Sequence, residues 1–293
     1  MQYGIYYAYW ERQWGGDYPK YAQKVGKLGF DILEISCASL PGMKKEERWK
    51  LKAAAKDAGI VLTAGYGPRL EENLSSADPK IVEQGFEFWK KTFEVLHELE
   101  ITVVGGGLYS YWPVDFSKPF NKEEDLKRSV ESMRRLAEMA SGITLGMEAL
   151  NRFEGYLINT AAEARSYVEA VGCKNVRVML DTFHMNIEED SLTEAIRTAG
   201  PYLGHFHIGE ANRRPPRPGT RMDWKAIGKA LRDTGYTGKV VMEPFVLMGG
   251  QVGKDIKVWR DISGGAGEAG EAGLDEAARS SAEYIRAVFE GST

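Results

Sequence analysis

Cysteine is scarce in this chain: only Cys37 and Cys173 occur among 293 residues. Two cysteines without metal-type spacing cannot form a disulfide framework or a thiolate zinc site. We expect both to be reduced and packed, which suits a protein of the cytoplasm.

Long apolar runs and excess positive charge are also missing. No stretch approaches the roughly 18 apolar residues of a membrane-spanning helix, and the opening MQYGIYYAYWERQW has no basic segment ahead of an apolar one. Lysine and arginine total 38 against 42 acidic residues, a formal net charge of −4. This balance provides few contacts to phosphates. We therefore expect a soluble protein without a nucleic-acid or membrane partner.

The residues that are abundant indicate a folded α/β protein. Hydrophobic residues make up 43% of the chain and charged residues 27%, enough for a large core and a solvated surface. Short β-rich runs alternate with helical patterns, which is typical of parallel strands joined by helices. The expected strands are residues 2–9, 30–36, 59–64, 101–106, 144–149, 176–181, 202–208 and 239–244. The expected helices are residues 18–28, 44–58, 79–99, 122–140, 161–171, 192–199, 224–234 and 274–289, with caps at Asn121, Thr160, Ser191 and Asp223.

Eight strand-helix units of about 37 residues each predict a (β/α)₈ TIM barrel that forms a single domain over residues 1–293. An open doubly wound sheet would carry a glycine-rich turn after its first strand, and residues 6–14 contain no glycine. The glycines at 105–107 are not followed by a nucleotide-binding pattern, so they indicate a close approach of the backbone at the barrel mouth. Residues 264–273, GGAGEAGEAG, are expected to form a flexible connector before the last helix.

Four chemically active residues end four consecutive strands: Glu148, Asp181, His207 and Glu243. Their separations of 33, 26 and 36 residues are close to one unit each, so neighbouring strands would direct them to one point on the active face of the barrel. Any single strand-end acid could instead cap a helix or pair with an arginine. Together they form a mostly hard-oxygen site that suits Mn²⁺, Co²⁺ or Mg²⁺ better than a structural zinc.

From spacing alone, a second histidine could be the ligand in place of His207. His205 shares the strand face of His207, because side chains repeat every second residue along a strand. We prefer His207 as the ligand since it lies nearer the strand end. His205 is interpreted as a core histidine or a residue that supports the ligands from behind.

Long segments around these residues resemble the ketose 3-epimerases, a family that includes the D-tagatose and the D-allulose (D-psicose) 3-epimerases. The segments are YGIYYAYW, GMEALNRFEGYLINT, VMLDTFHMNIEE, GHFHIGEANRRPPRPG, VVMEPF and DIKVWRDIS. The resemblance implies one divalent metal ion per subunit, Mn²⁺ or Co²⁺ with Mg²⁺ as a further candidate, and a homodimer or homotetramer. It implies that the metal ligands are Glu148, Asp181, His207 and Glu243, that the O1 to O3 end of the sugar is held by Glu154, His184 and Arg213, and that the pocket walls include Tyr6, Trp112 and Phe245.

The implied reaction is epimerisation of a free ketose at C3, with D-fructose and D-allulose as the leading pair. Such a reaction removes a proton next to a carbonyl and returns one to the opposite face. Our hypothesis is that the metal stabilises an enediolate while Glu148 and Glu243 flank C3 and exchange the proton. Tagatose with sorbose, or a ketopentose, are the other candidate substrates.

Related barrels support other functions, because a fold does not define a reaction. The alternatives are an aldose-ketose isomerase, an inosose dehydratase-like enzyme, a DNA-repair endonuclease-like enzyme and a non-catalytic sugar-binding barrel. The endonuclease would need more than the four histidines of this chain and a basic surface. Without the resemblance, His184 would be interpreted as a helix-entry residue and Glu154 as an exposed loop acid. The RRPPRPG segment at 213–219 is expected to form a stiff loop over the site.

Overall fold

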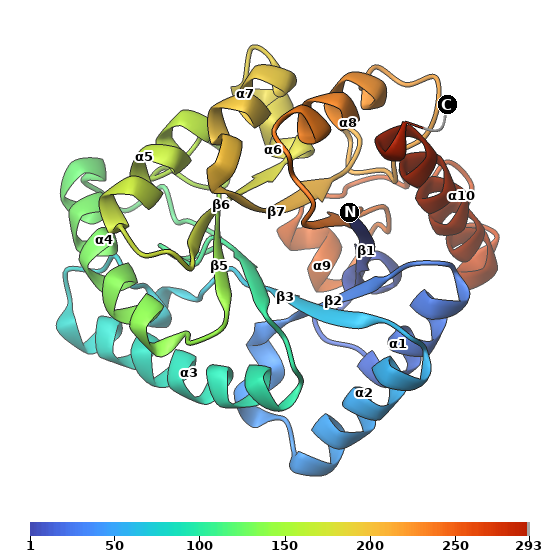
Figure 1. The fold of residues 1–293 in the computed structure, drawn as a ribbon. Helices are drawn as coiled ribbons and strands as arrows, with labels where there is room; N and C mark the ends of the chain where they lie inside the picture. Colours follow the sequence, from blue (N-terminus) through green and yellow to red (C-terminus); the bar gives the residue numbers. More distant parts are fainter. Residues whose placement is uncertain (292–293) are drawn as a thin grey trace.

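The fold is a closed barrel of eight parallel strands surrounded by helices (Figure 1). The computed structural model describes residues 1–291. Each strand pairs with the next along the chain, and β8 returns to β1 with Lys239 beside Gln2. The strands are β1 (Gln2–Tyr6), β2 (Ile32–Ser36), β3 (Val61–Gly65), β4 (Val103–Gly106), β5 (Thr144–Glu148), β6 (Val176–Asp181), β7 (Leu203–Ile208) and β8 (Lys239–Met242). The predicted TIM barrel is confirmed.

Helices cover the outside of the barrel. They are α1 (Tyr18–Lys27), α2 (Lys45–Asp57), α3 (Pro79–Glu98), α4 (Lys122–Met139), α5 (Ala161–Val171), α6 (Thr182–Glu188), α7 (Leu192–Ala199), α8 (Trp224–Asp233), α9 (Gly250–Asp255) and α10 (Gly270–Glu290). Short 3₁₀ turns are η1 (Tyr7–Trp10), η2 (Cys37–Gly42), η3 (Leu70–Glu72) and η4 (Gly200–Tyr202). The side chains of the four predicted caps, Asn121, Thr160, Ser191 and Asp223, each accept a backbone N–H bond from the first turn of their helix.

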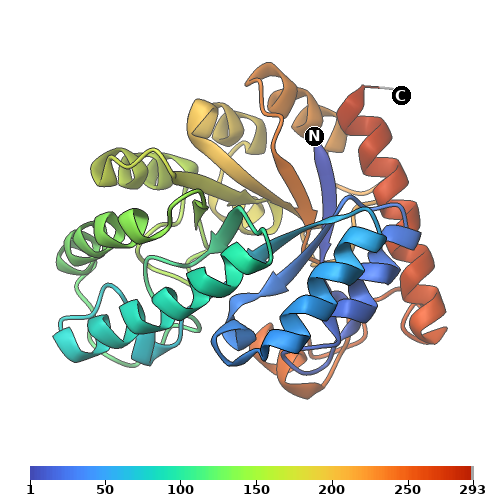
Figure 2. The same ribbon diagram turned by 60° about the horizontal axis from the view of Figure 1, so that its bottom comes forward.

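The structure differs from the expected elements at three helices and at several strand ends; the strand expected at 2–9 ends at Tyr6, and the strand expected at 239–244 ends at Met242. The short helices α6 and α9 were not among the expected helices. The last helix begins at Gly270, so the final four residues of the expected connector at 264–273 are helical. α10 lies beside α1 on the outside of the barrel (Figure 2), where Lys24 contacts Asp275 at 2.9 Å. Lys24 also pairs with Glu271, inside the glycine-rich segment, so tertiary contacts help to compensate for its weak helix propensity.

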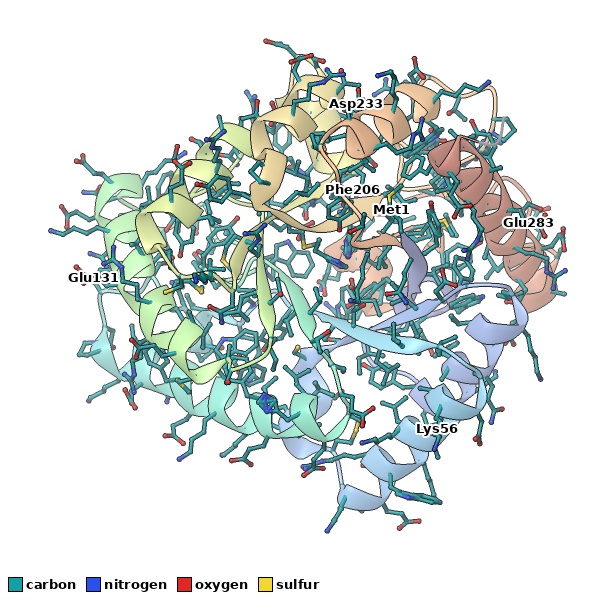
Figure 3. The ribbon with its side chains drawn as sticks, viewed as in Figure 1. Met1, Lys56, Glu131, Phe206, Asp233 and Glu283 are labelled. Atoms are coloured by element: carbon teal, nitrogen blue, oxygen red, sulfur yellow. The ribbon has the colours of Figure 1, made fainter. Side chains whose placement is uncertain are left out.

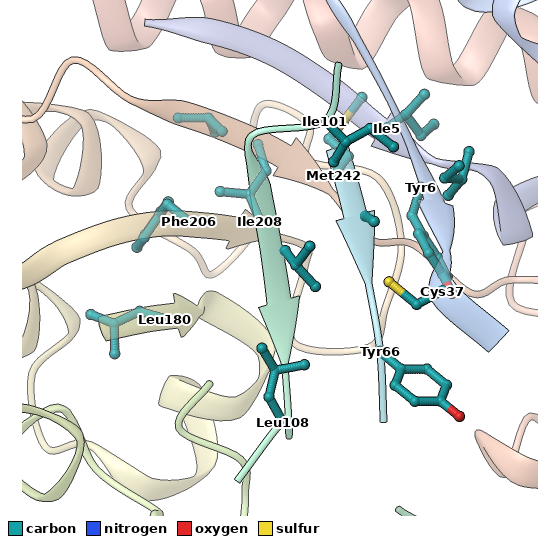
Figure 4. Close-up of a cluster of buried hydrophobic side chains, with 14 of the residues drawn as sticks. Ile5, Tyr6, Cys37, Tyr66, Ile101, Leu108, Leu180, Phe206, Ile208 and Met242 are labelled. Atoms are coloured by element: carbon teal, nitrogen blue, oxygen red, sulfur yellow. The ribbon is translucent and has the colours of Figure 1, made fainter. Parts of the chain in front are cut away.

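The strands bury side chains on both faces, as expected of a parallel sheet covered by helices. Ile5, Leu180 and Phe206 are fully buried within the apolar cluster shown in Figure 4. Charged side chains such as Lys56 and Glu131 project outward from the helices (Figure 3). Both cysteines are free, as predicted, although Cys37 is buried and Cys173 is only partly so. Among residues 1–291, no helix is long and apolar enough to cross a membrane.

The glycines of β4 allow the close backbone approach predicted for them. Gly106 has φ of 125°, and a Cβ at this position would overlap the backbone carbonyl of Tyr66. The Tyr66 N–H donates to the carbonyl of Gly105 at 2.9 Å. A Cβ on Gly105 would overlap the sulfur of Met179 inside the barrel. Small residues on β4 therefore let the end of β3 approach at the barrel mouth.

Candidate metal centre and active site

Four side chains meet at the carboxyl ends of β5 to β8. They are Glu148 at the end of β5, Asp181 at the end of β6, His207 on β7 and Glu243 just after β8. One potential ligand atom from each lies within 4.8 Å of the others. The structure thus brings together the four residues that the strand ends predicted, because neighbouring parallel strands present their ends on one face of the barrel.

The charges in this cluster favour a bound cation. Glu148 is buried, and its burial together with the charge of Glu243 raises the pKa of its carboxyl well above the usual range. Oε1 of Glu148 and Nδ1 of His207 are buried without a hydrogen-bond partner in the structure. Three carboxylates and one imidazole offer the hard-oxygen set that Mn²⁺, Co²⁺ or Mg²⁺ accepts. The residues therefore fit a divalent ion.

Arg213 supplies positive charge beside these carboxylates. Its Nη1 donates to Oδ2 of Asp181 and to Oε2 of Glu243, both at 2.8 Å. Burial opposes the charge of Arg213, but the carboxylates of Asp181 and Glu243 prevail and raise its pKa above the ordinary value. The guanidinium lies 3.8 Å from the ring centre of Phe183, a cation-π contact that restricts its orientation.

The loop that carries Arg213 is organised by a buried acid at the end of β7. Oε1 of Glu210 accepts hydrogen bonds from the backbone N–H of Arg217 at 3.1 Å, the hydroxyl of Thr220 at 2.9 Å and Nε1 of Trp224 at 2.9 Å. Arg213 itself has φ of 64°, and its N–H donates to the Glu210 carbonyl at 2.8 Å. The proline-rich segment is thus tied down at both ends. Sequence reasoning predicted the loop and missed Glu210.

His184 and Glu154 also lie in the site. The backbone N–H of Asn151 donates to Nδ1 of His184 at 3.1 Å, so Nδ1 carries no proton and the neutral ring has its proton on Nε2. Burial lowers the pKa of His184, in agreement with this neutral form. Glu154 accepts bonds from the Asn151 side chain at 3.0 Å and from Nε1 of Trp112 at 3.2 Å. The structure places both residues in the pocket rather than on an exposed surface.

A cavity of about 340 Å³ opens above the four-residue cluster. Its floor is polar, and aromatic rings form much of its wall. Trp14 lies edge-on to Trp112 and Phe245, with ring centres 6.2 and 6.3 Å away, and Phe245 is 6.1 Å from Tyr6. An apolar wall above a few convergent polar groups is typical of a small-molecule site. The predicted wall residues Tyr6, Trp112 and Phe245 all line this cavity.

Glu34 on β2 is a buried charged residue that sequence reasoning missed. Its Oε1 lies 2.6 Å from Nε2 of His207, and its Oε2 lies 2.8 Å from Nε2 of His205. These are hydrogen-bond distances, shorter than the roughly 3 Å that separates two ligands of one ion with bonds near 2.1 Å. The group is therefore a hydrogen-bonded support, not a second metal site. Its signal in the sequence is an acid within the otherwise apolar strand ILEIS.

Fold and site together define a class of protein: a TIM-barrel enzyme with a candidate divalent-metal site at the carboxyl ends of its strands. Residues 22–262 match the family described as the xylose isomerase-like TIM barrel. The D-psicose 3-epimerase of Ruminiclostridium cellulolyticum is 53% identical over 292 residues, which cover 99% of this chain and 98% of the relative.

Solved structures agree with this comparison. The D-psicose 3-epimerase of Clostridium cellulolyticum H10 with D-tagatose superimposes with a TM-score of 0.96, at 53% identity and with 99% of both chains covered. A D-psicose 3-epimerase in the presence of D-fructose gives a TM-score of 0.95, at 51% identity and with 99% of both chains covered. The chain belongs to the ketose 3-epimerases of the xylose isomerase-like TIM barrel family, and so to the isomerases. The resemblance stated from the sequence is confirmed.

Proposed function

We propose that this protein catalyses the reversible C3 epimerisation of free ketoses, with D-fructose and D-allulose (D-psicose) as the leading pair. One observation carries the proposal: Glu148 from β5 and Glu243 from β8 meet Asp181 and His207 on the floor of a sugar-sized cavity. The relatives support the substrate class, since they are named D-psicose 3-epimerases and include a structure with D-fructose.

The cofactor of this reaction would be one divalent ion per subunit, Mn²⁺ or Co²⁺. When bound by Glu148, Asp181, His207 and Glu243, the ion supplies Lewis-acid polarisation of the ketose carbonyl, which makes the neighbouring C3 proton more acidic. Asp181 and His207 would act only as ligands. Arg213 would keep the carboxylates of Asp181 and Glu243 in place from its buried position.

The proton is moved by the two glutamates. Glu148 ends β5 and Glu243 follows β8, three strands away in the closed barrel, and in the proposed reaction their carboxylates lie on opposite faces of the bound sugar. One glutamate removes the C3 proton and the other delivers a proton to the opposite face. The two exchange roles when the reaction runs in reverse.

Binding and water exclusion would fall to the remaining residues of the pocket. Nε2–H of His184 donates a hydrogen bond, and Glu154 accepts one, at the O1 to O3 end of the sugar. The rings of Tyr6, Trp112 and Phe245 cover the apolar faces of the sugar and exclude water from the proton-transfer step.

Assembly and location complete the proposal. We place the single barrel domain, residues 1–293, in a homodimer or homotetramer in the cytoplasm. The neighbouring exposed rings of Phe116 and Phe120 form an apolar surface feature that supports self-association. Free cysteines support a reducing compartment. Light scattering of the purified protein tests the assembly, and a mass equal to one chain would contradict it.

The experiment that tests the function uses metal-stripped protein and D-fructose in deuterated water. Chromatography identifies the product, and NMR locates the deuterium, with and without Mn²⁺ or Co²⁺. We expect metal-dependent formation of D-allulose with deuterium at C3. An aldose product or label at C1 would indicate an aldose-ketose isomerase. No conversion of fructose, tagatose or a ketopentose with any metal would overturn the proposed function.

A further inference from the structure

Glu34 is fully buried in the middle of β2 and contacts two histidines of β7 across the interior of the barrel. Its Oε1 lies 2.6 Å from Nε2 of His207. Its Oε2 lies 2.8 Å from Nε2 of His205 and accepts a hydrogen bond from the Thr63 hydroxyl at 2.8 Å. Both oxygens of this carboxylate are therefore used inside the protein, and neither contacts the substrate cavity.

These contacts determine where the two imidazoles carry their protons. An ionised carboxylate only accepts hydrogen bonds. Each histidine must therefore donate from Nε2, which leaves Nδ1 of a neutral ring without a proton. For His207, Nδ1 lies 3.7 Å from Oε2 of Glu243 and has no hydrogen-bond partner in the structure. In the neutral ring that a metal requires, the lone pair of this nitrogen faces the four-residue cluster.

We propose that Glu34 is a positioning residue for the metal centre, which selects the tautomer of His207 and holds its ring so that the Nδ1 lone pair faces the ion. The inference rests on the proposed role of His207 as a metal ligand. A histidine binds a metal only through an unprotonated nitrogen, and a carboxylate bonded to its other nitrogen orients the ring and increases its basicity. His205 and Thr63 occupy the second oxygen of Glu34 and restrict rotation of the carboxylate.

Glutamine at this position cannot serve both histidines in the same way. Its amide has one acceptor oxygen and one donor nitrogen. If the nitrogen faces His207, Nε2 must accept and the proton moves to Nδ1, where it opposes a cation. If the nitrogen faces His205, that ring must take the other tautomer inside a core where its Nδ1 has no partner. The first arrangement opposes metal binding directly, and the second keeps the metal-ready tautomer of His207 only by leaving an unpaired N–H of His205 in the core. Neither arrangement changes the side-chain volume appreciably.

The test compares Mn²⁺ binding by metal-stripped wild type, Glu34→Gln and a matched control, Thr63→Val. The control removes the hydroxyl bond to Oε2 and keeps the carboxylate and both histidine contacts. Mn²⁺ affinity is measured by calorimetry or by electron paramagnetic resonance. We expect a 10- to 100-fold loss of affinity in Glu34→Gln, on the scale of ligand-supporting residues. Thr63→Val, which loses one hydrogen bond, should bind within about threefold of wild type, and circular dichroism should show both variants folded at the assay temperature.

Turnover separates positioning from chemistry. Because Glu34 does not reach the cavity, Glu34→Gln should regain most of its kcat when the Mn²⁺ concentration is raised above the weakened Kd. If Glu34→Gln binds Mn²⁺ as tightly as the wild type does, the inference about Glu34 is overturned. The proposed function is still supported in that case, because the wild-type protein binds the metal. Wild-type protein that binds no Mn²⁺ would overturn both.

A second measurement needs no variant and decides the matter if Glu34→Gln does not fold. The chain has four histidines, so the imidazole ¹⁵N resonances of Mg²⁺-loaded wild type are readily assigned. We expect a hydrogen-bonded proton on Nε2 of His207 and none on Nδ1. A proton on Nδ1, or an unprotonated Nε2, would overturn the role of Glu34.

Discussion

Trp14 donates a hydrogen bond from Nε1 to Oδ2 of Asp255 at 2.7 Å. The bond joins the loop after β1 to α9, and both residues line the cavity. The backbone N–H of Val252 adds a second link, to the carbonyl of Arg12 at 3.1 Å. One aromatic wall of the pocket is thus held from a distant part of the chain.

We expect Asp255→Ala to weaken substrate binding more than catalysis. Loss of a hydrogen bond to a charged acceptor frees the Trp14 ring, and the KM for D-fructose should rise about three- to tenfold with kcat nearly unchanged. Steady-state kinetics measure both constants. Gln251→Ala is the control, because it removes a bond to the other oxygen of Asp255 and leaves Trp14 in place. A fall in kcat at constant KM would contradict this role.

Asp181→Asn should weaken metal binding strongly without unfolding the barrel. Oδ1 of Asp181 accepts the Phe183 N–H at the start of α6, and asparagine keeps this capping acceptor. The substitution removes the negative charge that Asp181 directs toward the metal cluster. We therefore expect the affinity for Mn²⁺ to fall by about 100-fold or more and the activity to fall with it. Metal content after dialysis and thermal unfolding provide the measurements. Asp223→Asn, at the cap of α8, should retain full metal content.

Isotope exchange can assign a face of the sugar to each glutamate. We expect Glu148→Gln and Glu243→Gln each to lower epimerisation by about 10²- to 10⁴-fold at saturating metal. Each variant keeps one glutamate that can act as a base, and the C3 hydrogens of D-fructose and D-allulose lie on opposite faces. One variant should therefore release deuterium from C3 of labelled D-fructose, and the other should release it from C3 of labelled D-allulose. NMR of both sugars follows the label. Release from the same sugar by both variants would rule out a division of the two faces.

The loop acid Glu210 should affect activity through Arg213. Glu210→Ala removes the acceptor for three hydrogen bonds, so the loop at 210–221 loosens and the backbone that carries Arg213 is held less firmly, although its guanidinium still contacts Asp181 and Glu243. We expect KM to rise about tenfold and the unfolding temperature to fall by a few degrees. Arg217→Ala keeps the backbone N–H that Glu210 binds, and should behave like wild type. Wild-type kinetics and stability in Glu210→Ala would contradict this role of Glu210.

Gly106→Ala should destabilise the barrel. The residue has φ of 125°, and a methyl group would overlap the Tyr66 carbonyl. We expect the free energy of unfolding to fall by about 3 kcal/mol, seen in denaturant titrations. The neighbouring Gly107→Ala would meet only the Leu150 side chain at 3.4 Å and should be tolerated. Similar stability of the two variants would contradict the close approach of β3 and β4.

Much of this protein follows from local sequence pattern. Alternating strand and helix signals predict the barrel, because parallel strands need crossover helices and their twist closes the sheet. The same closure brings strand ends to one face, so Glu148 and Asp181 could be placed together from their spacing alone. α9 was not predicted, because its six residues carry too weak a periodic signal.

The sequence by itself therefore determined the fold class and the four side chains that meet at the carboxyl ends of the strands. Only the tertiary structure decided which groups support them. Glu34 lies 173 residues from His207 and contacts it only because closure of the barrel faces β2 toward β7. Asp255 reaches Trp14 for a similar reason, 241 residues away. The spacing of residues along a chain indicates local secondary structure. Contacts across a closed barrel also depend on the register of every strand between the two residues.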